Sequence, residues 1–171
     1  MTLKVDKVLR KKLDRNLVCL SLTVFTGLFI SLYALFIEIK HANNPNYKPL
    51  CDLGQGVSCT AALLSKYGKG LGLLPEDSLL NLPNPVYGIF TYTTLVLVTN
   101  FSGTDRFLVN LLLIISIIIN LVSLYLAYIL YFILHNLCVV CVATYVVNFF
   151  LLVFSIQRKR LIRKLTSPKK E

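Results

Sequence analysis

Four of the five cysteines fall into two pairs, and they are the clearest candidates for chemistry in this chain. Cys51 and Cys59 are eight residues apart on a glycine-containing segment, and Cys138 and Cys141 form a Cys-x-x-Cys. A separation of three puts two thiols on one face of a helix, close enough to be bridged when the first turn relaxes. A helix N-terminus stabilises a thiolate, which is both a nucleophile and a good leaving group in exchange. The two pairs therefore favour a dithiol–disulfide relay.

Two static arrangements remain as alternatives. The four cysteines could form two permanent disulfides in a non-enzymatic membrane scaffold, or they could bind one zinc ion. A structural disulfide has no need of a Cys-x-x-Cys at a helix start, and an oxidising, apolar setting is unfavourable for zinc. Cys19 is expected to be a small apolar filler.

No motif for a bound cofactor or metal accompanies the thiols. The sequence has no glycine-rich phosphate loop, and its two histidines, His41 and His135, are far apart. We therefore expect no metal and no resident cofactor. A membrane dithiol that exchanges electrons with an apolar molecule points instead to a quinone.

The composition is that of a membrane protein. Of 171 residues, 56% are hydrophobic and 15% are charged, and the mean hydropathy is +0.69. Of the 18 Lys and Arg, six lie in residues 1–15 and seven in 157–171, so the net charge of +10 belongs to the ends. This pattern excludes a soluble enzyme with a large polar cleft, a disordered chain and a nucleic-acid binder.

The elements that must position the thiols are membrane spans. Uncharged runs of sufficient length cover 17–37, 107–134 and 137–156. Both tails, 1–16 and 158–171, are basic and so should be cytoplasmic, which requires an even number of crossings. The weaker run Val86–Phe101, extended to about 84–101, supplies the fourth. The sequence predicts an all-α membrane protein, with a four-transmembrane-helix bundle over 17–157 as its single domain.

This topology puts one long loop, 38–85, on the non-cytoplasmic side, where it forms a cap between the first two spans. The last span starts on that same side, so all four thiols share a compartment. A short helix is expected over 59–66 with Ser58 as its cap, and apolar residues of 71–82 should form a lid or membrane anchor. Tyr145 continues the Cys138–Cys141 helix face, and Asn110, Asn120 and Asn148 should bond between helices.

Several short motifs resemble the vitamin K epoxide reductase family, and within it the reductase-like branch. The resemblance covers about residues 17–157. It rests on the order and spacing of six segments: Leu-Tyr-Ala at 32–34, Leu50-Cys51-Asp52 with Ser58-Cys59, Gly68–Gly72, Asn81–Pro85, Leu124–Ala127 and Cys138–Tyr145.

The resemblance implies a role for each cysteine. Cys141 corresponds to the thiol that reacts with substrate, and Cys138 to the partner that closes the Cys138–Cys141 disulfide. Cys51 and Cys59 correspond to a loop disulfide, from which Cys59 exchanges transiently with Cys138. It also implies a substrate pocket, with Asn84 and Tyr145 bonding opposite ends of the substrate ring. Apolar contacts are expected from Leu63, Tyr87, Leu126, Leu130 and Val140.

The implied activity is reduction of vitamin K epoxide and vitamin K quinone to the hydroquinone, by a multi-pass protein of the endoplasmic reticulum membrane. A luminal thioredoxin-like protein would supply electrons, and coumarin anticoagulants such as warfarin would be candidate ligands. This sequence has Leu63 and Thr91 where coumarin-sensitive members often have aromatic residues, and Tyr87 where they have Phe. These differences alter the expected pocket shape. The alternative is a quinone-coupled thiol oxidase that forms disulfides in client proteins.

Overall fold

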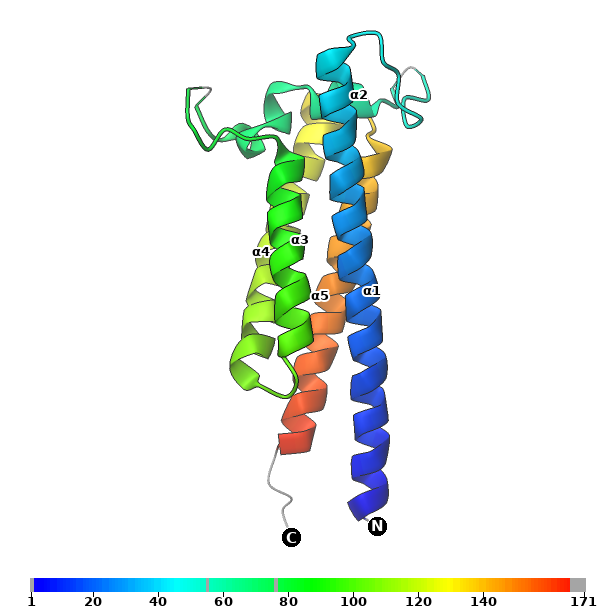
Figure 1. The fold of residues 1–171 in the computed structure, drawn as a ribbon, viewed down its shortest axis with the longest axis vertical. Coiled ribbons are helices and arrows are strands. Elements are labelled where there is room, and N and C mark those ends of the chain that lie inside the picture. The colour runs from blue at the N-terminus through cyan, green and yellow to red at the C-terminus, as the bar shows by residue number, and fades with distance from the viewer. Residues whose placement is uncertain (1, 55, 76, 167–171) are drawn as a thin grey trace.

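The computed structural model describes residues 2–54, 56–75 and 77–166, with side chains from Asp6 onward. Four long helices run side by side in one bundle (Figure 1): α1 (Thr2–Asn43), α3 (Asn84–Phe101), α4 (Arg106–Tyr128) and α5 (Val139–Thr166). Both termini point to the same end of the bundle (Figure 1). No strand occurs among the described residues, so the predicted all-α class is confirmed.

Three stretches of helix are long and apolar enough to cross a membrane, namely Asp6–Asn43, Arg106–Ile133 and Val139–Thr166. The chain is therefore a membrane protein. Helix α3 covers the 84–101 segment expected for the fourth span but is not among these three stretches, so a fourth crossing stays a prediction. Helices α1 and α5 extend past the apolar runs 17–37 and 137–156, because Lys, Arg and Leu favour a helix even outside a membrane.

The outer surface of the bundle is apolar, whereas its interior is closely packed. Phe29, Phe90 and Leu121 are 68%, 75% and 61% exposed, as expected for side chains that face lipid. Inside, a Cβ atom added to Gly27 would clash with the ring of Tyr92. Glycine at this position lets α1 approach α3 closely, which is how membrane helices commonly pack.

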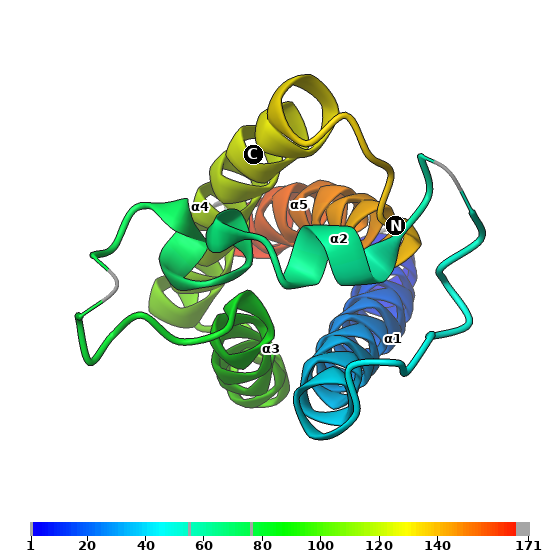
Figure 2. The same cartoon turned by 90° about the horizontal axis from the view of Figure 1, so that it is seen from above.

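Residues 44–83, which we call the cap, cover the end of the bundle opposite the termini. The cap contains α2 (Cys59–Leu63) and two 3₁₀ turns, η1 (Lys66–Gly68) and η2 (Gly70–Gly72). Viewed from above, α2 lies across the ends of the long helices (Figure 2). Ser58 caps α2 as predicted, because its Oγ accepts a hydrogen bond from the Ala61 N–H at 3.0 Å. The helix ends at Leu63, three residues earlier than expected, and η1 follows it.

The start of α3 holds one side of the cap. The Gly70 N–H donates to the Leu82 carbonyl at 2.8 Å, and the Tyr87 hydroxyl donates to the Leu80 carbonyl. Leu73 and Leu79 of this side are 67% and 96% exposed, so the apolar surface expected at 71–82 is present. Its contact with a membrane stays a prediction.

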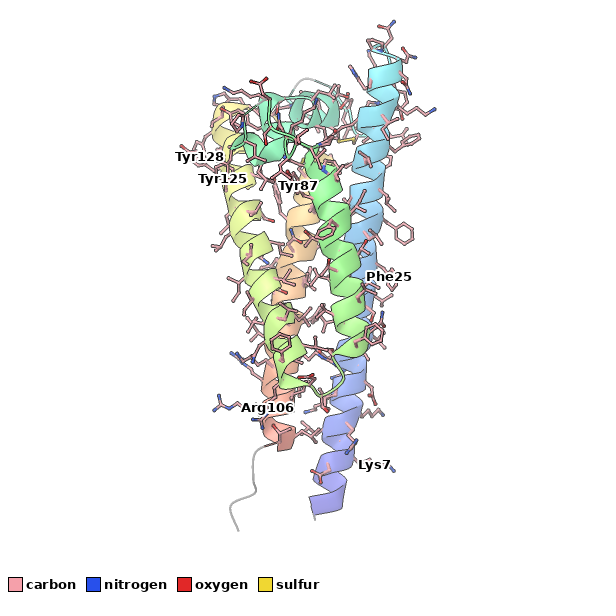
Figure 3. All side chains as sticks on the ribbon, turned by 60° about the vertical axis from the view of Figure 1, so that its left-hand side comes forward. Lys7, Phe25, Tyr87, Arg106, Tyr125 and Tyr128 are labelled. Carbon is pink, nitrogen blue, oxygen red and sulfur yellow. A yellow bond between two sulfur atoms is a disulfide. The ribbon has the colours of Figure 1, made fainter. Side chains whose placement is uncertain are left out.

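Helix α4 continues into a π-helical turn, η3 (Ile129–Ile133), before the chain reaches the Cys-x-x-Cys. His135 then adopts a left-handed backbone conformation (φ 47°), which redirects the chain toward α5. Tyr87, Tyr125 and Tyr128 lie near the cap end of the bundle, and Lys7 and Arg106 toward the other end (Figure 3). The two cysteine pairs lie at the cap end of the bundle, and the basic segments lie at the opposite end.

Candidate redox site

The loop cysteines form a disulfide, as expected from the resemblance. Cys51 and Cys59 are bonded, with their Cα atoms 5.8 Å apart, and both are buried. Asp52 lies beside them and accepts hydrogen bonds from Ser58 Oγ at 2.9 Å and from the Thr60 N–H at 3.1 Å. Partial burial raises the pKa of Asp52, but the hydrogen bonds outweigh this effect and hold the pKa below its usual value. Asp52 thus joins the two ends of the disulfide loop.

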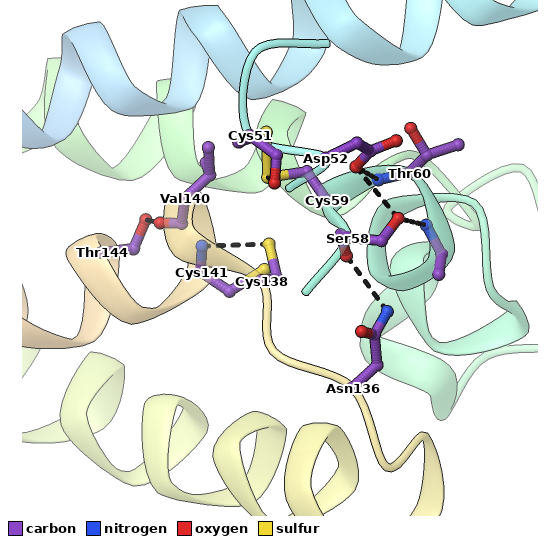
Figure 4. The surroundings of a disulfide bond; sticks show 11 residues. Cys51, Asp52, Ser58, Cys59, Thr60, Asn136, Cys138, Val140, Cys141 and Thr144 are labelled. Carbon is purple, nitrogen blue, oxygen red and sulfur yellow. Dashed lines mark hydrogen bonds between the residues drawn. A yellow bond between two sulfur atoms is a disulfide. The ribbon is translucent and has the colours of Figure 1, made fainter. Parts of the chain in front are cut away.

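A short parallel bridge brings this loop beside the Cys-x-x-Cys. The Ser58 N–H donates to the Leu137 carbonyl at 2.8 Å, and the Leu137 N–H donates to the Gly56 carbonyl at 2.8 Å. Asn136 Nδ2 adds a bond to the Ser58 carbonyl at 3.2 Å. Cys59 and Cys138 directly follow the bonded residues Ser58 and Leu137, so the bridge places them next to each other (Figure 4). Both are fully buried in one apolar cluster.

Cys138 occupies the position just before α5 and caps it. Its Sγ accepts the Cys141 N–H at 3.2 Å, and its carbonyl accepts the Val142 N–H at 2.9 Å. The Ser58 oxygen caps α2 in the same way. Hydrogen bonds from the Cys141 thiol and from N–H groups at the helix start lower the pKa of the Cys138 thiol, against the opposing effect of its burial. Cys138 and Cys141 are both free thiols here.

A cavity of about 320 Å³ lies under the cap, between the long helices. That volume falls within the range of small-molecule sites. Cys141 lines the cavity, whereas Cys51, Cys59 and Cys138 do not. Every residue expected to contact substrate is on its wall: Leu63, Asn84, Tyr87, Leu126, Leu130, Val140 and Tyr145. Only one of the four thiols therefore faces the space where an apolar molecule would sit.

The two polar residues expected to hold a substrate differ in their surroundings. Asn84 Oδ1 accepts the Leu71 N–H at 2.8 Å, and Asn84 Nδ2 donates to the Tyr67 carbonyl at 2.7 Å. Asn84 therefore fastens the cap to α3, and an amide nitrogen carries a second N–H for a ligand. The Tyr145 hydroxyl has no hydrogen-bond partner among the described residues. The substrate contacts of both residues stay predictions.

Part of the cavity wall was not predicted from the sequence. The Tyr92 hydroxyl donates to Asn148 Oδ1 at 2.7 Å, and Asn148 Nδ2 donates to Ser123 Oγ at 2.8 Å. All three residues line the cavity. Asn120 Nδ2 also donates to the Asn148 carbonyl at 2.8 Å, so the predicted interhelical roles of Asn120 and Asn148 are confirmed. Polar side chains inside apolar runs were the available signal, and Tyr92 did not stand out among nine tyrosines.

Glu38 was also missed, because the sequence places it at the start of the 38–85 segment, which was expected to be a loop. It lies near the end of α1, is only 7% exposed, and its Oε1 has no hydrogen-bond partner in the described part of the chain. A carboxylate directly after an apolar run was the signal that could have identified it.

Cys51, Asp52 and Cys59 form the one cluster of candidate metal ligands among the described residues. Ligand atoms of Cys51, Asp52 and Cys59 lie within 4.8 Å of one another. Zinc binds thiolates, however, and these two sulfurs are bonded to each other. In this oxidation state Cys51 and Cys59 form a disulfide, so the four cysteines do not offer four thiolate ligands.

Comparisons with known proteins agree with this geometry. The sequence profile described as "Vitamin K epoxide reductase family" matches residues 18–156. The chain is 39% identical over 136 residues to the rat protein named vitamin K epoxide reductase complex subunit 1, an alignment that covers 77% of this chain and 83% of the rat protein. It is 38% identical to the mouse protein of the same name over the same shares. The chain therefore belongs to the vitamin K epoxide reductase family.

Proposed function

We propose that this oxidoreductase reduces vitamin K 2,3-epoxide and vitamin K quinone to the hydroquinone, using the four cysteines as an electron relay. The observation that carries the proposal is the division of the thiols. Cys141 faces a mostly apolar cavity of about 320 Å³, while Cys138 lies against the loop disulfide. The names of the rat and mouse relatives support vitamin K epoxide as the substrate.

The chemical step begins at Cys141. Its thiolate attacks a carbon of the epoxide or quinone ring, which forms a C–S bond and moves an electron pair onto a ring oxygen. An N–H of Asn84 and the hydroxyl of Tyr145 stabilise that oxyanion in a cavity with little water. Cys138 then attacks the Cys141 sulfur, breaks the C–S bond and closes the Cys138–Cys141 disulfide. From the epoxide, the electron pair of the broken C–S bond breaks the neighbouring C–O bond, and the protonated oxygen leaves as water to give the quinone. From the quinone, the same electron pair stays on the ring and gives the hydroquinone, so each reduction transfers two electrons and two protons.

The relay then restores the dithiol. A reduced Cys59 attacks Cys138, giving a Cys59–Cys138 mixed disulfide and releasing Cys141. Cys51 attacks Cys59, re-forms the Cys51–Cys59 disulfide and releases Cys138. The oxidation state observed here, a loop disulfide beside two free thiols, is the state that this exchange leaves. A thioredoxin-like protein then reduces the loop disulfide, so no resident cofactor is required.

We further propose that α1, α3, α4 and α5 all cross the membrane of the endoplasmic reticulum, as one domain over 17–157. Helix α3 has 18 residues, or about 27 Å at 1.5 Å per residue, close to the hydrocarbon thickness. The basic segments of α1 and α5 lie at one end of the bundle (Figure 1), which supports two cytoplasmic termini and a luminal cap. Coumarin anticoagulants are candidate ligands of the same cavity.

The test is turnover by the purified full chain in detergent. With dithiothreitol and vitamin K epoxide, the wild-type chain should form quinone and then hydroquinone, and Cys141→Ala should form neither. Cys19→Ala is the matched control, because Cys19 is a free cysteine outside this site and should keep wild-type turnover. Equal turnover by Cys141→Ala and wild type would contradict the proposal.

The same assay distinguishes the reductase from the alternative function, a quinone-coupled thiol oxidase. Because thiol–disulfide exchange is reversible, these sulfurs can also carry electrons from client thiols to a quinone. A dedicated thiol oxidase would reduce quinone at the expense of a reduced client protein and leave the epoxide unchanged. Formation of quinone from the epoxide supports the reductase.

A further inference from the structure

A second cavity, of about 420 Å³, lies between α1 and α5 at the end of the bundle opposite the cap. Its wall includes four exposed cationic side chains, which we call the basic quartet: Lys12, Arg15, Arg160 and Lys164. None of the proposed redox residues contributes to it. This cavity is therefore separate from the proposed redox site.

The basic quartet has no acidic partner in the described part of the chain. Four like charges around one cavity repel each other, and an anion placed among them would relieve that repulsion. Cations next to a membrane span are common and need no cavity. Other exposed cations of the same segments, such as Lys7, Lys11 and Lys159, lie outside the cavity. The gathering of four exposed cations around one open groove between two helices is thus distinct from the other basic side chains of these segments.

A buried amide on the cavity wall adds a second requirement. Asn16 is only 6% exposed, and its Nδ2 donates to the Phe154 carbonyl at 3.1 Å. Its Oδ1 is buried and has no hydrogen-bond partner among the described residues. A buried acceptor without a donor destabilises the protein. A ligand with a negative charge would satisfy the quartet, and a hydroxyl group on the same ligand would satisfy Asn16 once the side chains that cover its Oδ1 move aside.

The position of the cavity indicates where that ligand comes from. Cys19 and Phe154, within the apolar runs, line one part of the wall, and Lys12 and Lys164, in the basic segments, line another. The cavity therefore crosses the boundary between membrane core and headgroup region. We propose that it binds the headgroup of an anionic phospholipid, with the phosphate among the basic quartet and a headgroup hydroxyl on Asn16. This inference concerns a site outside the proposed reaction and does not depend on it.

The experiment measures thermal unfolding of the purified full chain in detergent with short-chain lipids. At equal concentration, dioctanoyl phosphatidylinositol should raise the unfolding temperature most and dioctanoyl phosphatidylmethanol less, because the latter carries the same single negative charge but no headgroup hydroxyl. Dioctanoyl phosphatidylcholine and inorganic phosphate should have little effect. A phosphate effect equal to that of the anionic lipids would overturn the lipid assignment, and equal effects of the two anionic lipids would overturn the hydroxyl contact.

Matched variants test the location. Replacing the whole quartet by Gln should weaken phosphatidylinositol binding roughly fivefold for each cation removed. The control variant loses the same charge from outside the cavity, by Gln at Lys7, Arg10, Lys11 and Lys159. Equal binding by the two variants would overturn the proposal.

A milder change keeps the test usable if the quadruple variant does not fold. Gln157→Glu adds a negative charge to the cavity wall without changing its shape, and should abolish the lipid-dependent rise. Asn100→Asp is the matched control, since Asn100 is exposed outside the cavity and its variant should keep the rise. An unchanged rise in Gln157→Glu contradicts the site.

Discussion

The two cysteine pairs are held by different parts of the fold. Cys51 and Cys59 belong to the cap, where they form a disulfide tied by Asp52 to the start of a short helix. Cys138 and Cys141 belong to the start of α5 and are free thiols. Within this second pair the two sulfurs differ again, because Cys138 is fully buried against the cap and Cys141 lines the cavity.

In the proposed mechanism this difference separates reductant from substrate. Electrons that reach the loop disulfide would pass from Cys59 to Cys138, which lie in one buried cluster, and of the four paired cysteines only Cys141 lines the cavity. A polar reductant and an apolar substrate can then approach from different sides. The structural requirement is that the cap remain attached to α5, which the bridge between Ser58 and Leu137 provides.

The largest expected effect comes from the second pair. Cys138→Ala leaves Cys141 able to attack substrate but unable to release it, so steady-state turnover should fall by about three orders of magnitude or more. Turnover with dithiothreitol and vitamin K epoxide measures this. Because Cys138 also caps α5, Cys138→Ser is the companion variant that keeps a capping atom. A Cys138→Ser chain with near-normal turnover would remove Cys138 from the reaction.

The loop pair should behave differently. Replacing both Cys51 and Cys59 by Ala should abolish turnover driven by a thioredoxin-like protein but keep turnover driven by dithiothreitol, since a small dithiol can reduce the Cys138–Cys141 disulfide without the loop pair, through the cavity that Cys141 lines. The ratio of the two rates is the measurement. Equal losses with both reductants would show that the two pairs do not have separate roles.

A smaller effect distinguishes two tyrosines of the cavity wall. Tyr145→Phe removes a hydroxyl that has no protein partner in the described chain, and should lower kcat/KM about 10- to 100-fold without changing the unfolding temperature. Tyr92→Phe leaves Asn148 Oδ1 without its donor, and should cost about 1–3 kcal/mol of stability with kcat nearly unchanged. The reverse pattern would argue against Tyr145 as the substrate contact.

The smallest effect concerns pH. A lowered pKa means that the Cys138 thiol stays ionised to a lower pH than an unperturbed thiol does, so its reactivity is lost only below this lowered value. The acid limb for alkylation of Cys138 in the reduced chain, followed by mass spectrometry of the modified cysteine, should therefore lie below about pH 8.5, the value of an unperturbed thiol. A limb at or above that pH would show that the helix start does not activate Cys138.

Much of the helical framework could be predicted from apolar runs and charge. Helix α3 has the predicted bounds, 84–101, and Ser58 caps α2 as expected. The full length of α1 could not be predicted in this way, since residues 2–16 carry no hydropathy signal. Backbone propensity and the packing of Leu13 against Val109 and Ile162 support the helix there. The π-helical turn at 129–133 likewise has no signature in the local composition.

The site shows the same limit. Residue types and spacing identified the two thiol pairs, and the family resemblance identified the cavity residues, all of which line one space. The bridge between Val57 and Leu137 joins segments 80 residues apart and could not be predicted from either segment. The burial of Glu38 and the bond between Tyr92 and Asn148 depend on how neighbouring helices pack, which a single sequence does not reveal.

The most direct test of the division between Cys141 and Cys138 is to trap the substrate on the protein. The reduced Cys138→Ala chain is mixed with vitamin K epoxide, digested and analysed by mass spectrometry. An added mass of vitamin K on the peptide that carries Cys141, with none in Cys141→Ala, is the predicted result. An adduct on Cys138 in the Cys141→Ala chain, together with an unmodified Cys141 in the Cys138→Ala chain, would contradict it.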